Sequence, residues 1–416
     1  MPDLPTLDLS TLAAAARDAV AIRANLRLQP AGGPGTKVFP PTYVADDNRN
    51  HGNTRYAFER RRIDGEEVPC VLLDSVASQA NRMELALQEG WDAGELEFPL
   101  VQVDFAAADE DLEAPIGRVT ALQAPHRIYD AILRDSVDAD GVLFRYTPAG
   151  QRVTQATVRD ATALYHYCPT ALVFGAWDST GPKGGLGSKF QRTITSEIVA
   201  IGAQAGTKVG GRLDPLGIVK KAGPLREVGG RDGWAFEAPK GKKDSLNPSD
   251  VNHGNVAPSR DDEAGGITFD YARQTIVLSL PALRRLRFPQ GIDGTELADR
   301  KQAEAAARTA LAALALAGVV GAHAEGHDLR SGALLVGKGP LAFEIVGSDG
   351  TVSGTYTLDA EAASELLSVA AEQAAAAGLP WTREPLAALR PAEKLVKLLA
   401  KSQSLEAKEA LQAEEG

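Results

Sequence analysis

The chain has 416 residues, of which 44% are apolar and 24% charged, and its formal net charge is −11. This length exceeds one compact core of the usual size, so we expect several packed units or one domain with large insertions. We find no apolar run of the length of a bilayer and no signal-sequence pattern at the N-terminus, so we expect a cytoplasmic protein. Cys70 and Cys168 lack metal-ligand spacing and are expected to be buried free thiols.

The negative net charge argues against a nucleic-acid-binding protein, but the charge is unevenly distributed. Between Asp178 and Arg231 the chain has nine Lys and Arg against four Asp and Glu. The local field governs binding, whereas the global charge mainly affects solubility. A basic patch on an acidic protein therefore remains a hypothesis.

The first expected elements are a short helix over 9–16, with Ser10 as its N-cap, and a strand over 20–28. Apolar and polar residues alternate along this strand, as they do in a half-buried sheet. Arg23, Asn25 and Arg27 share its polar face. This face either contacts RNA or is simply solvated.

A long loop over 30–53, with Asp46 and Asp47 at its tip, precedes a predicted hairpin. The dipeptide Asp64-Gly65 separates strands over 55–63 and 66–73, and this dipeptide strongly favours a two-residue turn.

The second strand leads into a helix that begins at Asp74 or Ser75 and ends near Gly90. Ser75, Ser78, Gln79 and Arg82 form a polar stripe on this helix, rich in hydrogen-bond donors and nearly free of acids. Such a stripe suits phosphates or base edges, although a solvated face explains it equally well.

The centre of the chain is a glycine-rich, cationic loop over 176–192, expected to lie between buried strands over 170–176 and 193–201. Glycines allow the backbone to approach a ligand closely, and Lys183, Lys189 and Arg192 add positive charge, so the loop suits an anion such as phosphate. The spacing excludes a nucleoside-triphosphatase loop, because Ser188 separates Gly187 from Lys189.

Elsewhere the pattern is mixed. We expect a strand over 98–106, helices over 125–135 and 153–166, a glycine-rich insertion over 202–262, a strand over 266–280 and a helix over 296–316. Strands over 332–336, 342–346 and 351–358 precede helices from Asp359 to about 378 and from Pro391 to about 411. The fold class is α+β. His323 and His327 have the spacing of a metal pair, but the helical pattern ends near Gly321, which argues against a metal site.

Three stretches carry a family resemblance: 74–84 (DSVASQANRME), 177–192 (WDSTGPKGGLGSKFQR) and 196–199 (SEIV). Together they resemble the backbone subunit of the type I-G (formerly I-U) CRISPR Cascade, a Cas-seven-type member of the RAMP superfamily. The resemblance implies a ferredoxin-like, RRM-type palm with finger and thumb insertions and additional C-terminal helices. Copies would stack along CRISPR RNA and present it to target DNA, together with other Cascade subunits and a nuclease-helicase, without a catalytic residue, metal or cofactor.

The implied layout has six parts. They are a first palm strand region over 1–30, a finger-like insertion and hairpin over 31–73, a palm core with a helical insertion and the glycine-rich loop over 74–201, a candidate thumb over 202–265, further palm strands and a helix over 266–358, and C-terminal helices over 359–416.

The residues predicted to bind RNA are Arg23, Asn25, Arg27, Ser75, Ser78, Gln79, Asn81, Arg82, Lys183, Gly184, Gly185, Gly187, Lys189, Gln191, Arg192, Arg212, His253 and Asn255. Two alternatives remain. One is a RAMP-superfamily endoribonuclease that uses Asp46 and Asp47, and the other is an enzyme acting on a small phosphorylated molecule.

Overall fold

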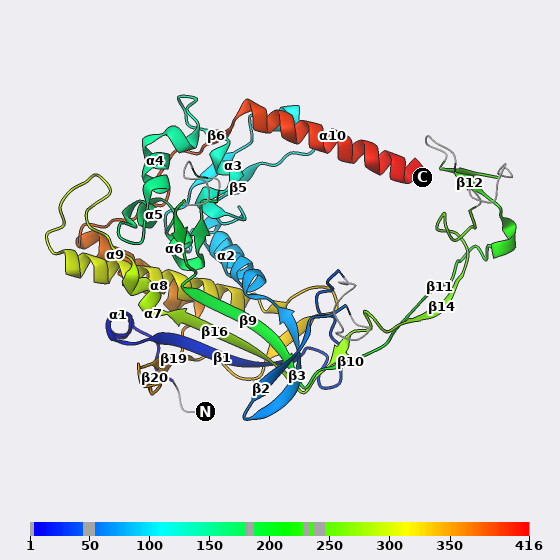
Figure 1. The fold of residues 1–416 in the computed structure, drawn as a ribbon, viewed down its shortest axis with the longest axis horizontal. Helices are drawn as coiled ribbons and strands as arrows, with labels where there is room; N and C mark the ends of the chain where they lie inside the picture. Colours follow the sequence, from blue (N-terminus) through cyan, green and yellow to red (C-terminus); the bar gives the residue numbers. More distant parts are fainter. Residues whose placement is uncertain are drawn as a thin grey trace.

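A large, curled antiparallel sheet forms the centre of the protein (Figure 1). The computed structural model describes residues 4–44, 55–179, 181, 187–227, 233–236 and 246–415. The strands follow the order β17 (His327–Asp328), β18 (Leu334–Gly337), β1 (Ala21–Pro30), β16 (Tyr271–Ser279), β9 (Ile194–Ile201), β3 (Glu66–Asp74) and β2 (Phe58–Ile63). In addition, β19 (Phe343–Val346) pairs with β1 and with β20 (Val352–Tyr356).

The alternation predicted over 20–28 is confirmed in β1. Ile22, Ala24, Leu26 and Leu28 are buried on one face, and the polar residues between them are at least partly exposed on the other. The strand pairs with β16 over eight residues, from Ala21 opposite Ser279 to Leu28 opposite Ala272. At β1 the sheet thus has an inner face in the core and an outer, polar face, whereas at β9 and β3 the outer face carries a small buried apolar cluster that includes Cys70, Val199 and Ile201.

The β2–β3 hairpin is also confirmed. Its turn residues, Asp64 and Gly65, have φ values of 52° and 89°, the left-handed conformation that a tight two-residue turn requires.

Helices cover the inner face of the sheet. They include α1 (Leu9–Asp18), α2 (Val76–Asp92), α6 (Pro169–Phe174), α7 (Leu280–Arg285), α8 (Arg300–Ala324) and α9 (Ala360–Ala376). Ala80, Met83 and Leu87 of α2 share one apolar cluster with Ile22 of β1 and Leu314 of α8. This cluster is the main core of the protein.

Helix α8 corrects the expectation that no apolar run is long enough to cross a membrane. By length and composition it could do so, with a mean hydropathy of 1.7, but 78% of its most apolar stretch is buried inside the protein. A helix that is apolar all round is typical of a core position.

Several predicted boundaries were wrong. The N-cap of α1 is Asp8, not Ser10; α2 continues past Gly90; and α8 continues past Gly321. The stretch 170–176 is not a strand, because Pro169 begins α6 and Gly175, with a φ of 81°, ends it. A short apolar run fits a buried helix as well as a buried strand, so its periodicity could not separate the two.

The region between α2 and α6 consists of short elements. The strand expected over 98–106 is only β4 (Gln102–Asp104), and the helices expected over 125–135 and 153–166 are divided. The elements are η1 (Asp109–Asp111), β5 (Arg118–Thr120), η2 (Arg127–Tyr129), α3 (Ala131–Arg134), β6 (Ser136–Val137), η3 (Phe144–Tyr146), α4 (Pro148–Gln155) and α5 (Thr162–Tyr167). Cys168, which follows α5, and Cys70 are buried and free, as predicted.

An arm leaves the sheet between β9 and β16 and extends away from it (Figure 1). At its base β10 (Gln204–Ala205) pairs with β15 (Ile267–Thr268), and further out β11 (Lys208–Arg212) pairs with β14 (Val256–Asp261). Its remaining described elements are η4 (Lys220–Ala222), β12 (Arg226–Glu227) and β13 (Trp234–Ala235).

The C-terminal segment contains β21 (Arg390–Pro391), which pairs with β6, and the long helix α10 (Glu393–Glu415). Helices α9 and α10 confirm the two predicted C-terminal helices. With 33% helix and 28% strand, the chain is a mixed helix-and-sheet protein, as expected.

Candidate nucleic-acid interface

The outer face of the sheet carries the first group of predicted residues. Asn25 and Arg27 are exposed and Arg23 is partly exposed. Arg23 donates a hydrogen bond of 2.6 Å to the Glu344 carboxylate on the neighbouring strand β19. The Arg27 guanidinium lies 4.0 Å from the centroid of the Tyr271 ring, which fixes it against the sheet.

The predicted polar stripe of α2 is in large part turned inward. Ser75 is the N-cap, and its hydroxyl accepts a hydrogen bond from the amide of Ser78. Arg82 donates from Nε to Asp74 Oδ2 at 2.9 Å, and Gln79 donates to the same oxygen at 2.7 Å. Because Asp74 is fully buried, this carboxylate requires such partners.

The same network continues across the sheet. The Gln79 side-chain oxygen accepts hydrogen bonds from Ser196 of β9 at 2.7 Å and from Gln274 of β16 at 2.8 Å. Gln274 in turn shares a hydrogen bond of 3.0 Å with His327 of β17. The motif over 74–84 therefore joins α2 to three strands, and of its polar residues Asn81 is exposed.

Arg82 and Arg330 attach this network to the 328–330 segment. Arg82 also donates to the carbonyl oxygens of Asp328 and Leu329, at 3.1 and 2.7 Å. Arg330 lies 3.6 Å from Asp74 Oδ1 and donates to the Leu73 carbonyl. The Arg82 guanidinium thus has hydrogen-bond partners within the protein and needs no bound ligand. That Arg82 binds RNA stays a prediction.

The glycine-rich loop is described only at its two ends; Lys183, Gly184 and Gly185 lie outside the described residues. The ends pair as β7 (Ala176–Trp177) and β8 (Lys189–Phe190). A Cβ on Gly187 would overlap the carbonyl oxygen of Asp178, so the chain requires glycine there. The Ser188 hydroxyl is within hydrogen-bond distance of two carbonyls at the end of α4, which anchors the loop to that helix.

The cationic residues after the loop have different environments. Lys189 is exposed, with its Nζ 5.3 Å from the Trp177 ring centroid, and Gln191 is exposed as well. Arg192 is partly buried and donates to the carbonyls of Phe174 and Val76, at 3.1 and 3.3 Å. Burial lowers the pKa of Arg192 below its ordinary value. Lys189 is thus available to a ligand, whereas Arg192 holds the loop against α6 and α2.

Two buried ion pairs support the loop, and neither was predicted from the sequence. Arg127 binds both carboxylate oxygens of Glu84, at 2.6 and 2.8 Å, and also donates to the Gly175 carbonyl. Burial raises the pKa of Glu84, an effect that Arg127 opposes. Arg145 binds Asp178 Oδ1 at 3.0 Å. The sequence contains no periodic signal for these pairs, because each joins separate segments.

The predicted residues of the arm stabilise its own turn. Arg212 lies within hydrogen-bond distance of the carbonyls of Gly254 and His253, both at 3.3 Å, and Asn255 accepts a hydrogen bond from the Asp214 amide. The His253 ring packs edge-on against Trp234. Around them the arm exposes several large apolar side chains: Val209, Leu213, Leu216, Val219 and Phe236.

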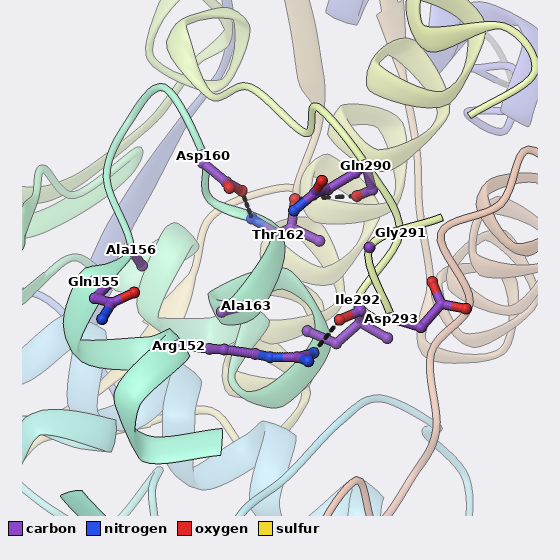
Figure 2. A pocket seen from close by; sticks show the side chains of 11 residues that line it. Arg152, Gln155, Ala156, Asp160, Thr162, Ala163, Gln290, Gly291, Ile292 and Asp293 are labelled. Atoms are coloured by element: carbon purple, nitrogen blue, oxygen red, sulfur yellow. Dashed lines mark hydrogen bonds between the residues drawn. The ribbon is translucent and has the colours of Figure 1, made fainter. Parts of the chain in front are cut away.

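A polar pocket of about 230 Å³ lies between α4, the start of α5 and the 290–294 loop (Figure 2). Arg152 crosses it and donates to the Ile292 carbonyl, while Asp160 accepts from the Thr162 amide at 3.2 Å. None of the predicted RNA-binding residues lines this pocket.

No group of three His, Cys, Asp or Glu side chains suited to a metal ion occurs among the described residues. The rings of His323 and His327 lie 5.5 Å apart, edge to face. Asp46 and Asp47, on which the endoribonuclease alternative depends, lie outside the described residues.

Residues 22–205 match the family described as CRISPR-associated protein GSU0053. The matched range contains all three stretches on which the resemblance rests. No curated protein matches the sequence significantly.

Proposed function

Because residues 22–205 match a family of CRISPR-associated proteins, we propose that the chain is the guide-RNA-binding backbone subunit of a type I Cascade complex. In this role copies of the chain bind CRISPR RNA side by side and leave its bases free to pair with target DNA. The family match carries the proposal, since it covers the motifs over 74–84 and 177–192.

In this proposal, the palm of the protein is the four-strand unit β19-β1-β16-β9. In chain order the unit runs β1, α2, β9, β16, α8, β19, which is the order of a ferredoxin-like β-α-β-β-α-β fold. All three pairings in the unit are antiparallel, and α2 and α8 pack together in the core on its inner face. The β2–β3 hairpin is inserted between β1 and α2 and extends the sheet beyond β9.

In this proposal, the arm corresponds to the thumb. It is inserted between β9 and β16, and its paired strands carry it away from the sheet (Figure 1). An isolated two-stranded ribbon is marginally stable in water, and this one exposes large apolar side chains such as Leu213 and Phe236. A second copy of the chain, bound to the same RNA, provides the surface on which the arm packs.

The subunit acts by binding rather than by catalysis, in the cytoplasm, with other Cascade subunits and a nuclease-helicase as its partners. The exposed residues that support RNA binding are Asn25, Arg27, Asn81, Lys189 and Gln191. They are hydrogen-bonding or cationic groups suited to a sugar–phosphate backbone, and none is an aromatic platform for reading bases.

The proposal is tested by expressing the chain with and without a CRISPR array and imaging the purified product by negative stain. We expect helical assemblies that contain CRISPR RNA. A product free of RNA would overturn the proposal, and cleavage of a labelled target RNA with Mg²⁺, lost in an Asp46→Ala/Asp47→Ala variant, would establish the endoribonuclease instead.

A further inference from the structure

Three cationic residues form a row across the outer face of the sheet. Arg27 of β1 and Arg273 of β16 are direct cross-strand partners, so their side chains share one face. Lys338 follows β18 on the other side of β1, and its amide donates to the Arg27 carbonyl at 2.7 Å. The β1–β18 register, which pairs Leu28 with Gly337, places Lys338 opposite Arg27. With adjacent strands about 4.8 Å apart, the row spans roughly 10 Å.

Two acidic residues on the same face of the sheet already have cationic partners. Glu197 of β9 accepts two hydrogen bonds from Arg61, at 2.5 and 3.2 Å, and Glu344 of β19 is bound to Arg23. Within the described part of the chain, none of the three cations of the row forms an ion pair. The row therefore keeps its positive charge unneutralised.

This arrangement is unfavourable for the isolated protein. Like charges directly opposite one another on a sheet repel, and here Arg27 lies between two of them. The Arg27 guanidinium is nevertheless held in place by the ring of Tyr271. One row further along the strands, Asn25 faces Thr275 and adds uncharged hydrogen-bonding groups. An anion bound along the row would neutralise this repulsion, and the cationic side chains that bind it would already be in position.

The outer face also has room for such a ligand. The helices that bury the sheet lie on its inner face, and along β1 and β16 the outer residues are exposed or partly exposed. A row of three cations suits a chain of regularly spaced phosphates better than it suits a single small anion.

From this row we infer that the backbone of single-stranded RNA crosses the strands of the sheet on the outer face, with its phosphates bound by Arg27, Arg273 and Lys338. The inference rests on the proposed function and adds Arg273 and Lys338 to its RNA-binding residues. Lys338 and Arg273 act as charges on phosphates, so binding at the row is independent of base sequence.

The test compares two triple variants with the wild-type chain. Arg27→Gln/Arg273→Gln/Lys338→Gln removes the row. The control, Arg60→Gln/Arg285→Gln/Lys301→Gln, removes the same charge from exposed positions elsewhere. Fluorescence anisotropy with two labelled RNAs of equal length, one a guide and one unrelated, gives the affinity at several salt concentrations.

We expect the row variant to bind both RNAs about tenfold or more weakly, and the control to change by less than about threefold. The slope of log K against log salt should become less steep by about 0.7 for every phosphate of the single strand that the variant no longer neutralises. Thermal unfolding of the row variant should occur no earlier than that of the wild type, because a repulsion has been removed.

The possible outcomes distinguish the proposed function, RNA binding by the chain, from the inference that RNA binds at the row. If the wild-type chain fails to bind either RNA at low salt, the proposed function itself is wrong. If the wild type binds and the row variant behaves like the control, the inference is overturned while the proposed function stands. If the row variant instead loses self-association in the absence of RNA and keeps its RNA affinity, the row is a protein interface and the inference is again overturned.

Discussion

Arg82 and Arg27 were both predicted to bind RNA, yet their surroundings predict opposite effects when either is replaced by glutamine. The Arg82 guanidinium is shared among Asp74 and two backbone carbonyls, whereas the Arg27 guanidinium rests on an aromatic ring at the outer face of the sheet. We expect Arg82→Gln to change stability and Arg27→Gln to change RNA affinity.

The cost of Arg82→Gln can be worked out from its contacts. Removing one partner of a buried ion pair costs about 3–5 kcal/mol. Here Arg330 and Gln79 still face the Asp74 carboxylate, and Arg82 is itself 33% exposed, so water can replace part of the interaction. We therefore expect the free energy of unfolding to fall by about 2–3 kcal/mol. Arg27→Gln should change it by less than about 0.5 kcal/mol, as surface substitutions usually do.

Urea unfolding, followed by tryptophan fluorescence, measures both free energies, since Trp91 lies in the core that α2 helps to form. RNA affinity is then measured under conditions in which each variant is folded. The folded Arg82→Gln variant should bind RNA within about twofold of wild type, and Arg27→Gln should bind about three- to tenfold more weakly. The reasoning is refuted if Arg82→Gln keeps its stability but loses RNA affinity.

Three further predictions concern other parts of the chain. Burial lowers the pKa of His327 from 6.5 to about 4, so below pH 6.5 the unfolded state binds a proton that the folded state does not. The free energy of unfolding should therefore fall by about 3 kcal/mol between pH 6.5 and pH 4. In urea titrations at several pH values, His327→Gln should abolish this part of the pH dependence. Gly187→Ala should displace the glycine-rich loop and weaken RNA binding, with faster amide exchange at β7 and β8 but little change in the sheet, because its Cβ would meet the Asp178 backbone. Deleting residues 207–264 should leave the rest of the protein folded, because Ala205 already pairs with Ile267 at the base of the arm. The same deletion should abolish assembly on RNA, as measured by sedimentation. An unfolded product or intact assembly would contradict this.

The sequence predicted the elements whose signal is local. The alternation along β1, the Asp64-Gly65 turn and the apolar face of α2 each depend on neighbouring residues, and each is present in the structure. The stretch over 170–176 shows the limit of such reasoning, because an apolar run that is buried on all sides has no informative period.

The candidate site was less predictable because its polar groups have partners far away in the chain. Gln79 and Arg82 have the spacing of a surface stripe, but Asp74, Ser196 and Gln274 turn Gln79 inward. Arg273 was missed for a related reason. It is significant only opposite Arg27, and this pairing depends on the register of two strands separated by more than two hundred residues.

Guide-RNA binding is tested most directly by purifying the chain from cells that also express a CRISPR array and sequencing the nucleic acid that remains bound. We expect guide RNA with several copies of the chain on each molecule, released by high salt as phosphate contacts require. Recovery of the chain without nucleic acid, or with cellular RNA that shows no enrichment of guides, would contradict it.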